Sequence, residues 1–128
     1  MKVLIADDSE AVRERLAEMI SEVPGAEVSG QAKDVQEAIR LIEEIKPDAV
    51  VLDIRMPKGS GIDVLKHIRN GVQPKPLVIV LTNYAYPHYR KKCLALGADY
   101  FFDKSVDFEK VIDVLGALIN SGQTGGEL

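Results

Sequence analysis

Residues 49–61 read AVVLDIRMPKGSG, and this stretch decides the fold. Its first five residues, Ala49–Asp53, are an alanine, three larger aliphatic residues and an aspartate. A methionine, a proline and two glycines follow within the next eight residues. A continuous apolar run, rather than one that alternates with polar residues, is typical of a strand covered on both faces in a parallel sheet. The stretch therefore predicts a central strand with an aspartate at its carboxyl end.

Similar apolar runs recur along the chain and alternate with stretches of helical period. Two clear runs are Val3–Ala6 and Leu77–Leu81, and two weaker ones are Glu27–Gln31 and Tyr100–Phe102. An alternation of strands and helices favours right-handed parallel crossovers, with helices on both faces of one sheet. We predict an α/β fold with a doubly wound, five-stranded parallel sheet and five helices.

Five stretches repeat apolar residues with the period of an amphipathic helix. Their first apolar residues are Val12, Val35, Ile62, Tyr89 and Phe108. The starts of the second, third and fourth helices are marked by Asp34, Ser60 and Pro87, residue types that favour helix N-termini. We expect residues 1–120 to form one domain and the glycine-rich residues 121–128 to form a flexible tail.

Composition limits the class of protein. The chain has 128 residues and a net charge of −4, which argues against a nucleic-acid binder held mainly by phosphate contacts. Its one cysteine, Cys93, cannot form an internal disulfide, which favours a reducing compartment. The apolar runs are too short to cross a bilayer. We therefore expect a cytoplasmic protein with no membrane contact.

Reactive side chains follow four of the five predicted strands. They are Asp7 and Asp8 after the first strand, Asp53 after the third, Thr82 after the fourth and Lys104 after the fifth. Open doubly wound sheets bind ligands beyond the carboxyl ends of their strands, so these groups are expected to converge. Three carboxylates that lie close together repel one another unless a proton or a cation neutralises part of their charge. Sites that offer only oxygen ligands are the kind that Mg²⁺ prefers. With a lysine to hold an anion, the set favours phosphoryl transfer to a carboxylate nucleophile.

A purely structural interpretation competes with this one. An aspartate after a strand is often the N-cap of the next helix, and Asp8 or Ser9 could cap the first helix. Capping does not account for Asp53, because seven residues separate it from the next predicted helix. Five such residues at one sheet edge are hard to obtain from capping alone.

These residues belong to four recognisable motifs: LIADDS, VVLDIRMPKGSGIDVL, VIVLTNYA and GADYFFDKS. In this order and spacing they resemble the receiver domain of bacterial two-component response regulators, of the CheY-like superfamily. The resemblance covers Lys2 to about Asn120. It implies a flavodoxin-like fold with strand order 2-1-3-4-5, a role in phosphorelay signal transduction, and a phosphoryl donor that is a sensor histidine kinase or a histidine phosphotransfer protein.

The resemblance also implies a role for each matching residue. Asp53 is the expected phosphoacceptor. Mg²⁺ (or Mn²⁺) is expected to bind Asp8, Asp53 and the backbone carbonyl of Arg55 directly, and Asp7 through water. Thr82 and Lys104 are expected to contact phosphoryl oxygens, and Phe101 takes the position of the aromatic switch residue.

Some positions differ from those of many family members. Ser105 stands where a proline, often with a cis bond, is common after the lysine, so a trans peptide is expected here. Asn83 replaces a small residue after the switch threonine. Arg55 and Tyr84 occupy positions that tune phosphoryl lifetime in the family. Their bulk is expected to exclude water from the acyl phosphate and to slow self-dephosphorylation.

We interpret the chain as a stand-alone, phosphorylation-controlled switch and not as a turnover enzyme. Its expected output surface is the fourth helix, fifth strand and fifth helix, which would act on a downstream protein or form a phosphorylation-dependent homodimer. Two alternatives remain. One is a degenerate receiver used only as a binding module. The other is an Asp-nucleophile phosphatase of the haloacid-dehalogenase type, which expects a second aspartate where Arg55 stands.

Overall fold

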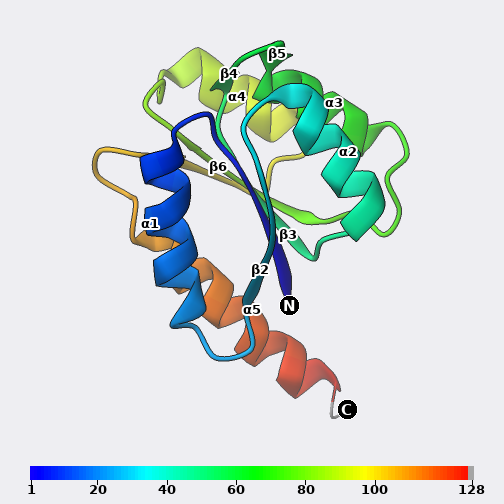
Figure 1. Cartoon of the computed structure of the whole chain (residues 1–128), viewed down its shortest axis with the longest axis vertical. Coiled ribbons are helices and arrows are strands. Elements are labelled where there is room, and N and C mark those ends of the chain that lie inside the picture. Colours follow the sequence, from blue (N-terminus) through cyan, green and yellow to red (C-terminus); the bar gives the residue numbers. More distant parts are fainter. Residues whose placement is uncertain (127–128) are drawn as a thin grey trace.

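The structure, a computed structural model, describes the backbone of residues 1–126 and the side chains of residues 1–121. Its main sheet contains β1 (Lys2–Ala6), β2 (Glu27–Ala32), β3 (Ala49–Leu52), β6 (Leu77–Thr82) and β7 (Tyr100–Asp103). These five strands are all parallel and lie in the order β2-β1-β3-β6-β7 (Figure 1). The predicted order 2-1-3-4-5 is therefore confirmed.

Strand β3 occupies the centre of the sheet because all four of its side chains are apolar and can be buried on both faces. Ala49 pairs with Val3 of β1 on one side and with Leu77 of β6 on the other. Ala49 and Val51 enter one hydrophobic core, while Val50 and Leu52 enter the other. Burying a valine or leucine fully stabilises a fold by about 1.5–3 kcal/mol, so this short strand is firmly held.

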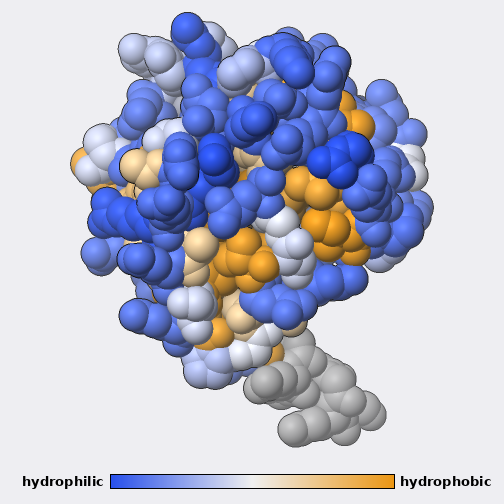
Figure 2. Space-filling model, in the orientation of Figure 1, coloured by the Kyte–Doolittle hydropathy of each residue, from blue (hydrophilic) through white to orange (hydrophobic). Residues whose placement is uncertain are grey.

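Five helices cover the sheet, two on one face and three on the other. They are α1 (Glu10–Ser21), α2 (Val35–Ile45), α3 (Gly61–Arg69), α4 (Pro87–Ala95) and α5 (Lys110–Gly126). Apolar residues of α1 and α5 pack in the core that contains Ala49, and those of α2, α3 and α4 pack in the core that contains Val50 (Figure 1). In the view of Figure 1, with α1 on the left and α2 and α3 on the right, the surface is mostly hydrophilic, with smaller hydrophobic areas near the middle (Figure 2).

The predicted helix starts are confirmed by their caps. Asp34 accepts a hydrogen bond from the Glu37 N–H at 2.8 Å, and Pro87 is in the first turn of α4. Ser60 accepts from the Ile62 N–H at 3.0 Å, and the Asp63 carboxylate accepts from the Ser60 N–H at 2.9 Å. These contacts satisfy N–H groups that have no partner within the first turn of a helix.

The segment after Asp53 differs from the prediction of a plain loop. Two short strands, β4 (Arg55–Met56) and β5 (Gly59–Ser60), form an antiparallel hairpin there. Pro57 and Lys58 form its turn, and the chain has positive φ angles of 65° at Lys58 and 133° at Gly59, the first residue of β5. Two-residue strands are too short to show the alternation by which a strand is read from sequence.

The carboxyl-terminal helix also departs from expectation. Its backbone continues to Gly126, into the segment 121–128 that we expected to be a flexible tail. Glu127 and Leu128 lie outside the described residues. The flexibility of this tail and the domain limit at residue 120 stay predictions. Among residues 1–126, none of the helices combines the length and the apolar character that crossing a bilayer needs.

Candidate functional site

Three carboxylates meet at the carboxyl ends of β1 and β3. Carboxylate oxygens of Asp7, Asp8 and Asp53 lie within 4.8 Å of one another. The neighbouring strands bring them together, because the Asp53 N–H donates to the Ala6 carbonyl at 2.9 Å. Asp7 and Asp53 are buried, whereas Asp8 is exposed and faces solvent. The cluster offers only oxygen atoms, which is the chemistry that suits a divalent cation such as Mg²⁺.

Lys104 completes this cluster from the far edge of the sheet. Its Nζ donates to Asp7 Oδ2 at 2.7 Å and to Asp53 Oδ2 at 3.1 Å. The Lys104 N–H also donates to the Thr82 carbonyl at 2.9 Å, which fixes the backbone at the end of β7. One ammonium group offsets only one of three carboxylates, so the cluster keeps a negative charge that a cation can neutralise.

Burial and charge act in opposite directions on these groups. Burial raises the pKa of the Asp53 carboxyl, Lys104 opposes this rise, and the negative charge of Asp7 adds to it. Burial by itself lowers the pKa of the Lys104 ammonium, but the carboxylates of Asp7 and Asp53 outweigh burial and leave that pKa above its ordinary value. Lys104 therefore remains charged at neutral pH.

The predicted switch residues, Thr82 and Phe101, are both buried. Thr82 is fully buried at the end of β6, and its Oγ1 accepts from the Tyr84 N–H at 3.0 Å. The hydroxyl of Thr82 also lies close enough to Asp53 to lower the pKa of that carboxyl. Phe101 is 5% exposed and belongs to the hydrophobic core beneath α2, α3 and α4. Its ring is therefore turned inward.

The three positions expected to tune phosphoryl lifetime closely follow Asp53 or Thr82 in the chain. Arg55 of β4 is exposed, and its Cζ lies 4.6 Å from the centre of the Tyr84 ring. Tyr84 is half-buried, and Asn83 is exposed. The structure thus brings Arg55 and Tyr84 together in a cation–π contact, which their separate positions in the sequence did not indicate.

Two contacts that sequence reasoning missed help to hold the carboxylates. Arg13 of α1 donates from Nη1 to the Asp7 backbone carbonyl at 2.8 Å. Gly61 approaches Asp53 so closely that a Cβ at residue 61 would overlap the Asp53 carbonyl oxygen. The glycine was visible in the sequence as a flexible residue, but the contact depends on the hairpin that precedes it. Nothing in the sequence separates Arg13, which is half-buried, from the other arginines on helices.

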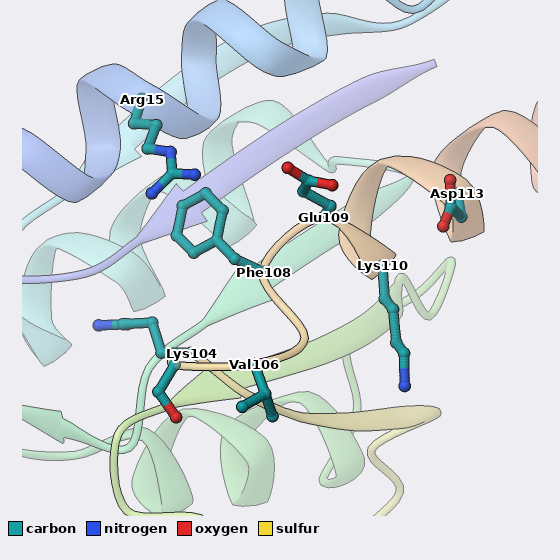
Figure 3. A pocket seen from close by; sticks show the side chains of 8 residues that line it. Arg15, Lys104, Val106, Phe108, Glu109, Lys110 and Asp113 are labelled. Carbon is teal, nitrogen blue, oxygen red and sulfur yellow. The ribbon is translucent and has the colours of Figure 1, made fainter.

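A cavity of about 500 Å³ lies beside Lys104, between α1 and the start of α5 (Figure 3). Arg15 of α1 stands over the Phe108 ring, with its Cζ 4.3 Å from the ring centre. Lys104 and Val106 lie on the other side of that ring (Figure 3). None of the three clustered aspartates lines this cavity, so it adjoins the acidic site without containing it.

The sequence model for the "response regulator receiver domain" matches residues 3–116. The chain belongs to this family. The receiver domain is 40% identical over 124 residues to a protein-glutamate methylesterase/protein-glutamine glutaminase 2 of Vibrio vulnificus, covering 94% of this chain and 35% of that protein. It spans about a third of the length of the curated relatives that it matches.

Solved structures agree with this assignment. The response regulator domain of Thermotoga maritima CheB superposes on the receiver domain with a TM-score of 0.81, at 32% identity and 94% coverage of both chains. A CheX–CheY–BeF3–Mg²⁺ complex from Borrelia burgdorferi gives a TM-score of 0.83, at 30% identity, with coverage of 93% and 89%.

The expected trans peptide after Lys104 is also present, since the only cis bond among residues 1–126 is Gln73–Pro74.

Replacing Gly61 with alanine is expected to lower the free energy of unfolding by about 1–3 kcal/mol, the usual cost of forcing a methyl group into filled space. Urea unfolding measures this change. Gly116→Ala is the matched control, because nothing lies within 4 Å of a Cβ built there, within α5. That variant should gain about 0.5–1 kcal/mol. Equal stability of Gly61→Ala and wild type would contradict the close approach.

Replacing Asp53 with asparagine is expected to raise the melting temperature at pH 7 in buffer containing EDTA. Because the pKa of Asp53 is raised in the folded chain, that chain binds more protons than the unfolded one between the two pKa values. The stability of the wild-type chain therefore falls as pH rises through this window, and the variant has no such proton to lose. The gap in melting temperature should widen with rising pH. A gap that is constant or reversed would contradict the assigned pKa direction.

Proposed function

We propose that Asp53 accepts a phosphoryl group from the histidine of a sensor kinase or of a histidine phosphotransfer protein. The observation that carries this proposal is Lys104, whose ammonium contacts the carboxylates of both Asp7 and Asp53. A fixed cation beside a carboxylate from a different strand suits stabilisation of charge on a transferring phosphoryl group. Membership of the receiver family supports the same role.

In the proposed reaction a carboxylate oxygen of Asp53 attacks phosphorus, and the bond from phosphorus to the imidazole nitrogen breaks. An acyl phosphate is left on Asp53, and the imidazole carries the leaving electron pair. Lys104 keeps its contact with Asp7 and exchanges Asp53 Oδ2 for a phosphoryl oxygen. The Thr82 hydroxyl, close to Asp53, is placed to donate to another phosphoryl oxygen.

Mg²⁺ (or Mn²⁺) is the proposed cofactor. Asp8, Asp53 and the Arg55 carbonyl would hold it directly, and Asp7 would hold it through water. The bound cation would offset the negative charge shared by the carboxylate and the phosphoryl group. The cluster of three carboxylates supports this assignment, and Mg²⁺ accompanies the CheY of the Borrelia burgdorferi complex.

We propose a protein target for the output, with α4, β7 and α5 as the contacting surface. Three of the four large hydrophobic side chains exposed among the described residues, Tyr86, Leu94 and Tyr100, lie on β7, on α4 or next to the start of α4. Control of a protein-glutamate methylesterase is one candidate output, because relatives of that name match the chain over about a third of their length. Sedimentation of the phosphorylated chain alone would reveal the alternative output, a homodimer.

We further propose that the chain catalyses only its own phosphorylation and slow dephosphorylation, in a cytoplasmic setting. The intact set of acidic, hydroxyl and lysine groups argues against a degenerate receiver, which would need none of these contacts. The residue two after Asp53 is Arg55, so the site lacks the second aspartate that the phosphatase alternative expects.

Asp53→Asn is expected to reduce labelling by acetyl phosphate and Mg²⁺ to background, because an amide cannot act as the nucleophile. Mass spectrometry of the intact chain, which detects the added phosphoryl group, measures the outcome. Asp113→Asn, an exposed position on α5, is the matched control and should label like wild type. Labelling retained in Asp53→Asn would place the acceptor elsewhere, and labelling that persists in EDTA would remove the metal from the proposal.

Arg55→Ala is expected to shorten the half-life of the acyl phosphate about two- to five-fold, as the loss of one exposed cation–π contact would predict. In this proposal the Arg55 guanidinium, which lies over the Tyr84 ring, would restrict the approach of water to Asp53. The decay of labelled chain after removal of acetyl phosphate gives the half-life. Arg69→Ala, an exposed arginine of α3, should leave it unchanged. An equal or longer half-life in Arg55→Ala would refute the shielding role.

A further inference from the structure

Arg90 connects helix α4 to strand β7. Its Nη1 donates to the Phe101 backbone carbonyl at 3.1 Å, and its Cζ lies 5.9 Å from the centre of the Phe101 ring. A single side chain thus contacts both the backbone and the aromatic ring of one residue. Arg90 is itself exposed, as are Lys91 and Lys92, the two cations that follow it on α4, so its contacts with Phe101 and not burial distinguish it. Arg90 is therefore the α4 cation with a defined partner on the sheet.

The electrostatic surroundings of Arg90 also favour this position. Asp107, in the connection between β7 and α5, has a pKa below its ordinary value, chiefly because Lys110 donates to it, with further contributions from the Asp103 N–H and from the positive charge of Arg90. The Asp103 N–H donates to Asp107 Oδ2 at 3.1 Å. Arg90 thus has the Phe101 carbonyl as a hydrogen-bond acceptor and the Asp107 carboxylate as a favourable, opposite charge.

The residues that Arg90 contacts lie on the same strand as the site lysine. Phe101 pairs with Val80 of β6, and Asp103 pairs with Thr82. Lys104 follows at once, and its N–H donates to the Thr82 carbonyl. Only two residues of extended chain, Phe102 and Asp103, separate the residue whose carbonyl Arg90 contacts from Lys104, which contacts Asp7 and Asp53. A shift of β7 relative to α4 would therefore also move Lys104.

The Phe101 ring is buried while Lys104 still contacts the Asp53 carboxylate. The same structure thus combines a buried Phe101 ring with an Asp53 carboxylate that carries no phosphoryl group. A buried ring under an exposed helix needs neighbours that keep the strand in register with that helix, and the Arg90 contacts supply them.

We propose that Arg90 is a positioning residue that keeps the Phe101 ring buried against α4 and holds β7, with Lys104, in register for the reaction at Asp53. The part of this inference that concerns the ring stands on the contacts alone, whereas the part that concerns reaction rate rests on the proposed function. Arg90 itself touches neither the phosphoryl group nor the metal ligands. It acts through the backbone of β7.

The test replaces Arg90 with glutamine and observes the ring directly. The chain has three phenylalanines, Phe101, Phe102 and Phe108, so 4-fluorophenylalanine labelling gives three ¹⁹F resonances, which Phe→Leu variants assign. Without any phosphodonor, Arg90→Gln should shift or broaden the Phe101 resonance and leave that of Phe108 in place. Lys91→Gln removes the same charge from the next residue and should change neither. In Arg90→Lys the new side chain can reach the Phe101 carbonyl but lacks the planar guanidinium that lies near the ring. The Phe101 resonance of this variant should therefore lie between those of wild type and Arg90→Gln.

Reaction rate provides the second readout. Arg90→Gln should slow labelling of Asp53 by acetyl phosphate about five-fold, a typical coupling between two sites, and Lys91→Gln should not. An unchanged Phe101 resonance, or equal shifts of all three resonances with a lower melting temperature, would overturn the proposal. A labelling rate equal to wild type would also overturn it. Failure of the proposed function itself would show differently, as a wild-type chain that takes up no phosphoryl group.

Discussion

Two carboxylates that end neighbouring strands repel each other, and one ammonium group from the edge of the sheet holds them together. Asp7 and Asp53 are both buried, and Lys104 donates to each of them. In a partly buried setting such charges interact far more strongly than in water. The order of the parallel strands supports this arrangement, because it places β1 beside β3 and turns the end of β7 toward both. The rest of the site depends on this balance of charge.

The two-sided core makes the position of Asp53 rigid. Successive residues of β3 enter different cores, so a shift of the strand along its axis would disturb both faces of the sheet. Beyond the strand, the Ile54 N–H donates to Asp53 Oδ1 at 2.7 Å and the Gly61 N–H donates to the Ile54 carbonyl at 2.7 Å. The side chain of Asp53 is therefore oriented by its own neighbours before any partner arrives. Such rigidity suits the proposed role of Asp53, because a fixed carboxylate needs little reorganisation before it reacts.

Much of the fold could be predicted from the sequence because its strongest signals are long and repetitive. The continuous apolar run of β3 and the caps at Asp34 and Ser60 are local patterns with a direct physical cause. The acidic cluster could also be predicted, since parallel strands deliver their terminal residues to one edge. The hairpin β4–β5 could not, because each of its strands has two residues and no period.

The contacts of three arginines could not be predicted from the sequence either, but for a different reason. Arginine is ordinarily expected to be exposed to solvent, so its presence at a position predicts no contact. The partners are also distant in sequence or belong to the backbone, as is the case for Arg13, Arg55 and Arg90. Family resemblance drew attention to Arg55 and Tyr84 as separate positions, yet their mutual contact required the folded chain. Long side chains of this kind acquire a function through geometry that residue type alone does not encode.

The contact between Lys104 and Asp7 spans 97 residues of sequence. During synthesis Asp7, Asp8 and Asp53 all emerge well before Lys104 does. A nascent chain that ends before β7 can form the acidic cluster but not its counter-charge, and it also lacks the strand that completes one edge of the sheet. The site thus gains its full set of charges only after synthesis has reached Lys104, when α5 alone among the helices still has to follow.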